Sequence, residues 1–436
     1  MTNKKEFLIP LSGGVFASRK KHIIFCESDK AYSLNCMVET VDRDLWSVSI
    51  GDWNDFDICD WNVLCGKSVY LWPDKQKDGE TKNYARLQRV SKKLMSLSPR
   101  PKIYWINPDD LEIKEGGDLE DFIEVYSPND KIVIEQIHSV LANSYSSEPS
   151  GKVKKRIEDA ISGKRETIRL PWDDIDKATM AIAPGTVTLI CGEGGTAKSL
   201  FLTQLCEFWH SKLKRAVALF ELEEDREYHL MRILAQKTGE PGITNDRWIK
   251  ENPDIARALY KAHEGLLDEM GKIISEAPVE SVTLTYLAKW VDEQARSGKR
   301  IICIDPVTAV ASGGDIWVED LKFMMAAKQS IVETGASLVL VTHPKKGGGS
   351  IAGMDSLSGG ACWARFSQTI LWLKNLGDKK ECDVLVNGCQ MTVEANRMLA
   401  VLKARNSFGG GSNYAMNLHG LVLEECGEML KLKKGE

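Results

Sequence analysis

The segment CGEGGTAKSL, residues 191–200, places three glycines just ahead of a Lys-Ser pair. Glycines allow backbone N–H groups to point at phosphate oxygens, and the N-terminus of a following helix adds its dipole. A lysine at this spacing reaches the β- and γ-phosphates, and the next hydroxyl holds Mg²⁺. The segment therefore predicts a site for ATP and Mg²⁺. Its residues are Gly192, Glu193, Gly194, Gly195, Thr196, Ala197, Lys198 and Ser199.

Ala197 departs from the usual pattern G-x-x-x-x-G-K-[ST], which has glycine directly before the lysine. Taken alone, the segment also fits an ordinary turn between a strand and a helix. If the position requires a positive φ, alanine costs about 1–2 kcal/mol relative to glycine. A packed loop can absorb that strain, so we still expect Lys198 and Ser199 to bind nucleotide, with Ser199 as a Mg²⁺ ligand.

Acidic residues follow two later β-type runs. The run RIICID ends in Asp305, where a carboxylate can hold the water shell of Mg²⁺, although a buried strand with a capping aspartate has the same appearance. The run ALFELEED leads into Glu221, Glu223, Glu224 and Asp225. One of these carboxylates could polarise the water that attacks the γ-phosphate, and the others are typical of a helix N-terminus.

The order of elements predicts two α/β domains. From Leu170 onward, β-type runs such as VTLICG, RIICID and SLVLVTH alternate with helical stretches, which indicates a mainly parallel sheet. Residues 1–128 show a similar alternation, with HIIFCE, KSVYLWPD and KIYWINP as β-type runs. The polar, mostly basic composition that follows predicts a linker with one helix over residues 129–167, ahead of a second domain over 168–436.

Composition excludes several classes of protein. The chain has 436 residues, 43% of them hydrophobic, and a formal net charge of -5, so any nucleic-acid contact must use a local basic strip. Its 11 cysteines are scattered singly, which favours free thiols in a reducing compartment over disulfides or structural zinc. No apolar run approaches 18 residues, so the sequence predicts no membrane span.

The motifs of the second domain, taken in order, resemble one family. The segments PWDDIDKATMAIAPGTVTLICGEGGTAKSLFLTQ, ALFELEEDREYHLMRIL, RIICIDPVTAV, SLVLVTHPKK, SLSGGACWARFSQTILWLK and VLKARNSFGGGS are similar to the RecA-like core of hexameric replicative helicases. The similarity extends to the DnaB-like, RepA-like and phage primase–helicase group. It implies a RecA-like P-loop fold, ATP hydrolysis, a homo-oligomeric hexameric ring and 5′→3′ movement along single-stranded DNA.

The same resemblance assigns roles to single residues. The catalytic glutamate of the family matches Glu223, and its Mg²⁺-associated aspartate matches Asp305. The polar residue that senses the γ-phosphate matches His343. The Lys-x-Arg pair that reaches into the ATP site of the neighbouring subunit matches Lys403 and Arg405. Two residues apart on a β-strand, those side chains would leave the same face.

A glycine-rich segment is the candidate DNA contact. The run HPKKGGGSIAGMDS carries Lys345, Lys346 and Gly347, and six copies of such a loop would line a ring channel and hold the phosphates of one strand. Two adjacent lysines are also typical of a solvated turn. A second loop position, ASGGDIWVED, is acidic and less suited to DNA.

The first domain resembles the Toprim fold of primases and topoisomerases over about residues 10–128. That fold needs a glutamate and a D-x-D pair that converge on Mg²⁺. Glu27 and Asp74 match, but Gln76 replaces the second aspartate, and Asp118 and Asp121 match the later acidic pair. We interpret the domain as a degenerate Toprim that binds metal weakly through Glu27, Asp74 and Asp118 and serves a structural or partner-binding role.

Three functions fit these observations. The first is an ATP-dependent ring helicase of a phage, prophage or plasmid-type replicon, which acts on forked duplex DNA in the cytoplasm of a bacterial host. Its expected partners are a primase, a polymerase or a loader, and no membrane. The second is a RecA-like ATPase scaffold that assembles on DNA without unwinding it. The third, an active primase–helicase, requires a working Toprim site.

Overall fold

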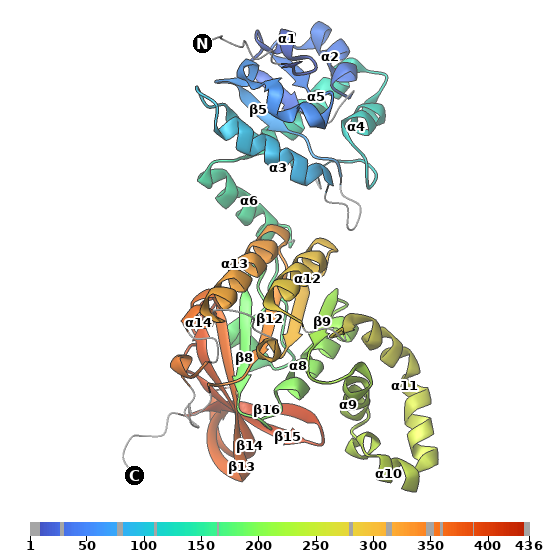
Figure 1. Ribbon diagram of the computed structural model, residues 1–436, viewed down its shortest axis with the longest axis vertical. Coiled ribbons are helices and arrows are strands. Elements are labelled where there is room, and N and C mark those ends of the chain that lie inside the picture. Colours follow the sequence, from blue (N-terminus) through green and yellow to red (C-terminus); the bar gives the residue numbers. More distant parts are fainter. Residues whose placement is uncertain are drawn as a thin grey trace. The chain divides into compact units, whose positions relative to one another are not determined.

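The chain divides into two compact units, Met1–Lys164 and Arg165–Glu436, each with its own sheet (Figure 1). The computed structural model describes residues 9–26, 30–75, 82–108, 111–163, 165–278, 282–310, 316–345, 353–357, 361–386 and 388–430. Both units alternate strands with helices, so the α/β class predicted from the sequence is confirmed.

The first unit is built on a five-stranded sheet in the order β3-β2-β5-β6-β7, together with a two-stranded β1-β4 pair. Strands β3, β2, β5 and β6 are parallel, and β7 runs antiparallel to β6. The strands are β1 (Ile9–Pro10), β2 (His22–Phe25), β3 (Leu45–Val48), β4 (Cys59–Asp60), β5 (Ser68–Leu71), β6 (Lys102–Trp105) and β7 (Tyr145–Ser146). The α-helices are α1 (Gly14–Ala17), α2 (Lys30–Val41), α3 (Lys82–Met95), α4 (Leu119–Tyr126), α5 (Asp130–Asn143) and α6 (Pro149–Ile161).

Helix α5 belongs to the core of the first unit. Its residues Val133, Ile134 and Ile137 are almost fully buried in one cluster with Phe122 of α4 and Leu34 of α2. Residues 129–167 were expected to form a linker. The first half of this interval instead contains α5, which belongs to the core of the first unit. The apolar residues of α5 recur every three to four positions, so one face of the helix must be covered.

The second unit has a nine-stranded sheet in the order β10-β9-β11-β12-β8-β13-β14-β15-β16. Strands β10 to β13 in this order are parallel, and the last three continue the sheet in antiparallel fashion. The strands are β8 (Val187–Gly192), β9 (Val217–Glu221), β10 (Ile274–Glu276), β11 (Ile301–Asp305), β12 (Ser337–Thr342), β13 (Thr369–Val386), β14 (Cys389–Ala404), β15 (Asn413–His419) and β16 (Val422–Met429).

Helices cover both faces of this sheet. They are α7 (Asp173–Thr179), α8 (Lys198–Glu207), α9 (Arg226–Thr238), α10 (Asp246–Glu251), α11 (Pro253–Ile273), α12 (Leu284–Arg296), α13 (Ile316–Thr334) and α14 (Ala361–Phe366). Every residue of β8, β9, β11 and β12 is buried, as expected for parallel strands between two helical layers. Among the helices that the structure describes, none is long and apolar enough to span a bilayer.

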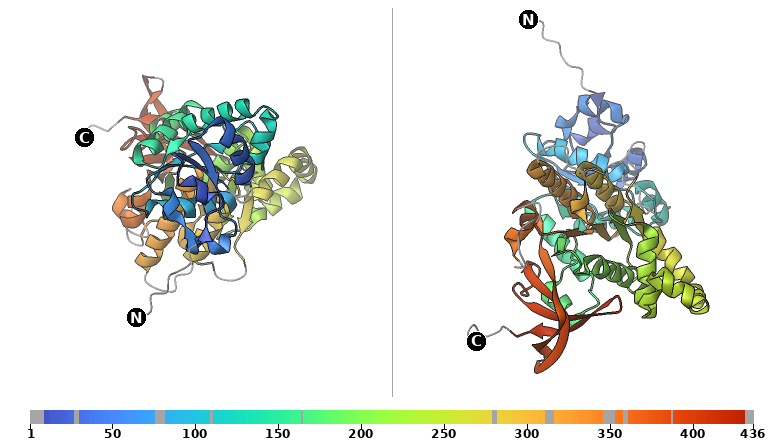
Figure 2. Two further views of the ribbon diagram at one scale, coloured as in Figure 1. Left: turned by 90° about the horizontal axis from the view of Figure 1, so that it is seen from above. Right: turned by 60° about the horizontal axis from the view of Figure 1, so that its bottom comes forward.

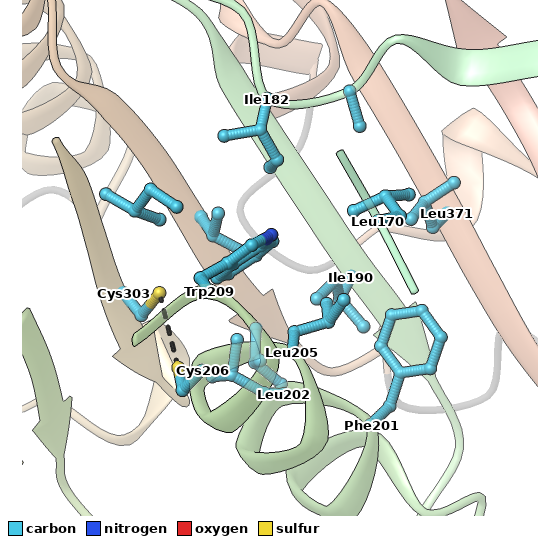
Figure 3. Packing of buried hydrophobic residues seen from close by; sticks show 14 of the residues in the cluster. Leu170, Ile182, Ile190, Phe201, Leu202, Leu205, Cys206, Trp209, Cys303 and Leu371 are labelled. Atoms are coloured by element: carbon cyan, nitrogen blue, oxygen red, sulfur yellow. Dashed lines mark hydrogen bonds between the residues drawn. The ribbon is translucent and has the colours of Figure 1, made fainter. Parts of the chain in front are cut away.

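Alternate residues of the central strands enter two separate cores. On one face Ile190 of β8 packs with Phe201, Leu202 and Leu205 of α8, as Figure 3 shows. On the other face Leu189 packs with residues of α12 and α13. The first of these cores packs α8 against β8, and the loop that joins the two elements lies at the carboxyl end of β8.

Two parts of the second unit extend beyond the central layers. Helices α9, α10 and α11 form a helical group beside β9 (Figure 1). Strands β13 and β14 make a long antiparallel ribbon at the other side of the sheet (Figure 2). These two strands are 18 and 16 residues long.

Candidate nucleotide-binding site

The loop between β8 and α8 has the backbone shape that its glycines predict. Gly192 has φ +159°, and a Cβ atom there would lie 2.4 Å from the carbonyl oxygen of Leu373 in β13, so only glycine fits. Gly195 also has a positive φ, of +73°. Lys198 is the first residue of α8, which places the loop at a helix N-terminus where backbone N–H groups attract anions.

Ala197 lies in the left-handed region, with φ 76° and ψ 31°. Glycine adopts this conformation without strain, whereas the Cβ of alanine comes close to the backbone and costs about 1–2 kcal/mol. The departure from the usual pattern is thus a strained residue inside an otherwise intact loop.

We predict that Ala197→Gly raises the free energy of unfolding by about 1 kcal/mol, because it removes this strain. ATP hydrolysis should stay intact or increase. Urea unfolding measures the stability change. The matched control is Ala326→Gly in the exposed middle of α13, where glycine should instead destabilise by about 1 kcal/mol. A loss of stability at position 197 would contradict the argument.

Lys198 is held at the centre of the site. Its side chain is buried, with the residue only 6% exposed, and its Nζ donates a hydrogen bond to the carbonyl oxygen of Glu193 at 2.9 Å. Burial lowers the pKa of Lys198, and the nearby Asp305 carboxyl acts in the opposite direction. A buried ammonium beside a row of backbone N–H groups is suited to bind phosphate oxygens.

Ser199 and Asp305 come together as a candidate Mg²⁺ site. Asp305 ends β11 and is 2% exposed, and the nearby Ser199 side chain acts to lower the pKa of its carboxyl. The Oδ2 atom of Asp305 has no partner among the described residues. The described residues contain no group of three or more metal-ligating His, Cys, Asp or Glu side chains. A hydroxyl and one carboxylate nevertheless fit Mg²⁺, which keeps several waters and takes its other ligands from the nucleotide phosphates.

Binding of MgATP should weaken below pH 7. Burial raises the pKa of Asp305 to about 7, and the Glu221 carboxyl adds to that rise. Mg²⁺ would bind the ionised carboxylate, so protons should compete with it at lower pH, by up to about tenfold per pH unit. Calorimetric titration with MgATP from pH 6 to 8 measures this, and metal-free ATP is the control for protonation of the nucleotide. Equal losses of affinity for both ligands would contradict the prediction.

Glu223 and His343 face each other across the site. Glu223 follows β9, His343 follows β12, and Glu223 Oε1 lies 3.6 Å from His343 Nε2. Burial lowers the pKa of His343, the Lys198 charge lowers it further, and Glu223 opposes both. A neutral imidazole can exchange hydrogen bonds with both a carboxylate and a phosphate oxygen. Of the four acids that compete in the sequence, Glu223 is thus the one that the structure places next to His343.

Glu221 has a different environment, which sequence reasoning did not foresee. It pairs in register with Asp305 across β9 and β11, and its Oε2 lies 3.2 Å from Nε2 of His229 in α9. Both residues are 1–2% exposed. Burial raises the pKa of Glu221 and lowers that of His229, so both side chains are driven toward their neutral forms. Glu221 therefore belongs to a buried pair beneath the site.

Lys198, Asp305, Glu223 and His343 all line one pocket of about 390 Å³. Arg232 of α9 also lines it and stacks over the ring of Tyr228 at 3.9 Å from the centroid. No sequence motif identifies Arg232 as a pocket residue, because it lies far from the phosphate-binding loop along the chain. The lining residues are Gly194, Gly195, Ala197, Lys198, Ser199, Leu200, Glu223, Arg232, Asp305, His343 and Leu418. The glycine-rich loop, Asp305 and Glu223 therefore converge on one cavity.

Lys403 and Arg405 are not among the described residues that line this pocket. Lys403 lies on β14 and its Nζ donates to the carbonyl oxygen of Ala364 in the same unit. Arg405 follows the end of β14 and its side chain is exposed. The pairing of β13 with β14 shifts register between Ile370 and Leu371. Lys403 and Arg405 therefore lie beyond the regularly paired part of β14.

The candidate DNA segment is only partly described. Pro344 forms a bridge with Leu357, and the backbone N–H of the exposed Lys345 donates to the Ser356 carbonyl at 2.8 Å, so the ends of the segment lie together. Lys346 and Gly347 lie outside the described residues.

In the first unit, Asp74, Asp118 and Asp121 each have partners within the unit. Asp118 caps α4 and accepts from the backbone N–H groups of Glu120 and Asp121, and the Asp121 carboxyl accepts in return from the Asp118 N–H. Asp74 accepts from the Asn83 amide at 3.0 Å. Glu27 and Gln76 lie outside the described residues. A capping box accounts for the spacing of Asp118 and Asp121 without a metal.

Comparison with known proteins agrees with this geometry. Residues 178–349 match the model of the family described as the AAA domain. This part of the chain resembles an AAA domain. The match begins just before β8 and ends after His343, so the AAA-like region contains the phosphate-binding loop, Asp305 and Glu223.

The chain is also similar to a phage protein. The DNA helicase/primase of Enterobacteria phage T3 is 24% identical over 271 residues, which cover 56% of this chain and 45% of that protein. The chain thus matches less than half the length of this relative. The resemblance to phage helicases that the motif order predicted is confirmed. A solved structure described as an ATPase domain matches at 14% identity with a TM-score of 0.48, covering 64% of this chain and 98% of that chain.

Proposed function

We propose that this protein is an ATP-dependent DNA helicase of the phage replicative type. It forms a ring of identical subunits, moves along single-stranded DNA and separates the strands of a forked duplex. The observation that carries the proposal is the single pocket in which Lys198, Asp305 and Glu223 converge within the AAA-like region. The relative from phage T3, which matches 56% of this chain, bears both helicase and primase in its name.

Each side chain of the pocket has a role in the proposed reaction. When bound, Mg²⁺ supplies charge that neutralises the β- and γ-phosphates, and Ser199 and Asp305 would hold it. Lys198 binds the phosphate oxygens. Glu223 accepts a proton from the attacking water, and His343, 3.6 Å away, links the position of Glu223 to the presence of the γ-phosphate.

Completion of the site requires a second subunit in this proposal. Arg405 is exposed and is absent from the described lining of the pocket, so it is free to serve the ATP site of a neighbour. A planar, permanently charged guanidinium is suited to the charge on the transferring phosphate. Ring assembly therefore follows from the proposed chemistry, and six subunits with 5′→3′ movement are the arrangement that the resemblance implies.

The segment around Lys345 is the proposed DNA contact. The exposed Lys345 stands at the base of a segment whose ends are joined at Pro344 and Leu357. Several copies of Lys345 and Lys346 around a ring would neutralise phosphates of one strand, which makes binding strongly salt-dependent.

A forked duplex with a single-stranded 5′ tail tests the function. The protein should displace the labelled strand only with ATP and Mg²⁺, and the Glu223→Gln variant should bind the fork without displacing it. ATP hydrolysis stimulated by DNA without strand displacement would instead indicate a RecA-like scaffold. Negative-stain images with ATP and oligo-dT test the assembly, since a closed ring distinguishes a ring motor from an open filament.

We also propose that the first unit is a degenerate Toprim-like domain without independent catalysis. Its four parallel strands, β3-β2-β5-β6, support the proposed fold, and the helix cap formed by Asp118 gives that carboxylate a structural role. Incubation with single-stranded template and ribonucleotides should therefore yield no labelled primers. Primers that disappear in the Glu27→Ala variant would show that the domain is an active primase.

A further inference from the structure

A basic cluster surrounds the point at which Arg405 leaves the sheet. It consists of Lys328 of α13, Lys403 of β14 and Arg405. Among the described residues, no carboxylate lies within ion-pair distance of any of the three. Three cations gathered without an internal anion repel one another, so this edge of the unit favours an anion that comes from outside.

Gln368, directly before β13, connects two of these residues. Its side-chain oxygen accepts from Lys328 Nζ at 2.8 Å, and its backbone carbonyl accepts from the Arg405 N–H at 2.9 Å. The same side-chain oxygen accepts from the Val187 N–H at 2.9 Å, which joins Gln368 to the first residue of β8. Lys328 also donates to the Gly185 carbonyl at 2.6 Å. Lys328, Gln368 and Arg405 thus form a continuous hydrogen-bonded chain.

The position of Lys328 is electrostatically unfavourable for a residue with a purely structural role. Burial lowers the pKa of Lys328 to about 8, and the charge of Arg405 contributes to the decrease. Burial and the Arg405 charge also lower the pKa of Lys403. A methionine of similar length would fill the space without this repulsion. An anion bound at Arg405 would offset this repulsion.

We propose that Lys328 and Gln368 are positioning residues for Arg405, which hold it toward a phosphate of the nucleotide bound by a second copy of the chain. The inference rests on the proposed ring function and deepens it. Gln368 fixes the backbone of Arg405 relative to β8, and Lys328 fixes the side chain of Gln368. Strand β8 leads into the phosphate-binding loop. Gln368 therefore connects Arg405 to the nucleotide site of its own subunit.

The test replaces Lys328 with methionine. Lys328→Met should bind MgATP within about twofold of the parent, because the nucleotide pocket is lined by other residues. Its kcat for ATP should fall by roughly 10- to 100-fold, since a displacement of about 1 Å in a catalytic group has effects of that size. Lys322→Met, an exposed lysine on the same helix, is the matched control and should keep full activity. Lys328→Arg should restore part of the rate.

Mixing experiments separate positioning from general damage. Mixed with Glu223→Gln protein, Lys328→Met should regain activity, because some interfaces pair an intact Glu223 with an intact Lys328–Arg405 edge. Mixed with Arg405→Ala protein, Lys328→Met should regain no activity. Both variants impair the side of the subunit interface that supplies Arg405. Gln368→Leu should behave like Lys328→Met, which provides a second variant if either protein folds poorly.

The outcomes distinguish the inference from the function on which it rests. If Arg405→Ala is complemented by Glu223→Gln and Lys328→Met is not, the positioning role is wrong and the ring mechanism stands. A wild-type kcat for Lys328→Met also overturns the inference alone. If Arg405→Ala itself is not complemented although subunits exchange, the action of Arg405 on a neighbour fails, and the role of Lys328 fails with it.

Discussion

Lys198→Ala is expected to reduce ATP hydrolysis by roughly 100-fold or more, which is the scale of losing one preorganised charge at a developing transition-state charge. The ammonium is buried at the end of the phosphate-binding loop and lies close enough to Asp305 for their charges to interact. Truncation leaves the phosphate oxygens with backbone N–H groups alone. Both MgATP binding and turnover should therefore decrease, and coupled-enzyme kinetics with calorimetry measures the two separately.

The control for Lys198→Ala is Lys289→Ala. The Lys289 side chain is 79% exposed and lies 3.6 Å from Glu293 on α12, so its removal takes away a lysine charge without affecting the pocket. Such surface pairs contribute about 0–1 kcal/mol to stability, and activity should remain unchanged. Thermal unfolding of both variants shows whether each is folded. Normal turnover by a folded Lys198→Ala protein would exclude this loop as the catalytic nucleotide site.

The strands around the site could be predicted because each depends on a run of residues that are adjacent in sequence. A run such as IICID is apolar throughout up to its final aspartate, and only a strand between two helical layers buries every residue of it. Once β8 and β11 are parallel strands in one sheet, their carboxyl ends lie at the same edge. The meeting of Ser199 with Asp305 was therefore foreseeable from motif order.

The contacts beneath and beside the site could not be predicted, because they depend on how separate helices and strands pack together. Lys328 reaches Gln368 across 40 positions, and His229 reaches Glu221 only because α9 folds back over β9. Neither pair has a spacing that a motif could record. The conformation of Ala197 was likewise undetermined by sequence, since the residue type alone argued against the positive φ that the loop adopts.

The boundary of the first unit illustrates a different limit. The basic stretch around α6 suggested a linker, and that composition outweighed the apolar periodicity of Val133, Ile137 and Leu141 just before it. In the structure this periodicity is what places α5 in the core of the first unit. Apolar residues at helical spacing were therefore a better guide to packing than the average polarity of the surrounding segment.

Arg405→Ala is expected to bind MgATP almost normally and to hydrolyse it about 10³- to 10⁵-fold more slowly, the range over which an arginine acting on a neighbour's phosphate accelerates transfer. The side chain is exposed and no ion pair holds it among the described residues, so its removal should leave the subunit stable. Lys403→Ala should have a smaller effect on turnover, because the Lys403 ammonium is already bonded to the Ala364 carbonyl within its own unit.

A mixture of Arg405→Ala and Glu223→Gln proteins decides whether Arg405 acts between subunits. Neither variant should hydrolyse ATP alone. In mixed rings, an Arg405→Ala subunit supplies an intact Glu223 and its Glu223→Gln neighbour supplies an intact Arg405, so a fraction of interfaces becomes complete. Activity should rise to a maximum near equal proportions and fall toward zero at either extreme. If labelled subunits exchange and no activity returns at any ratio, Arg405 serves its own subunit or none, and the ATP site must be complete within a single chain.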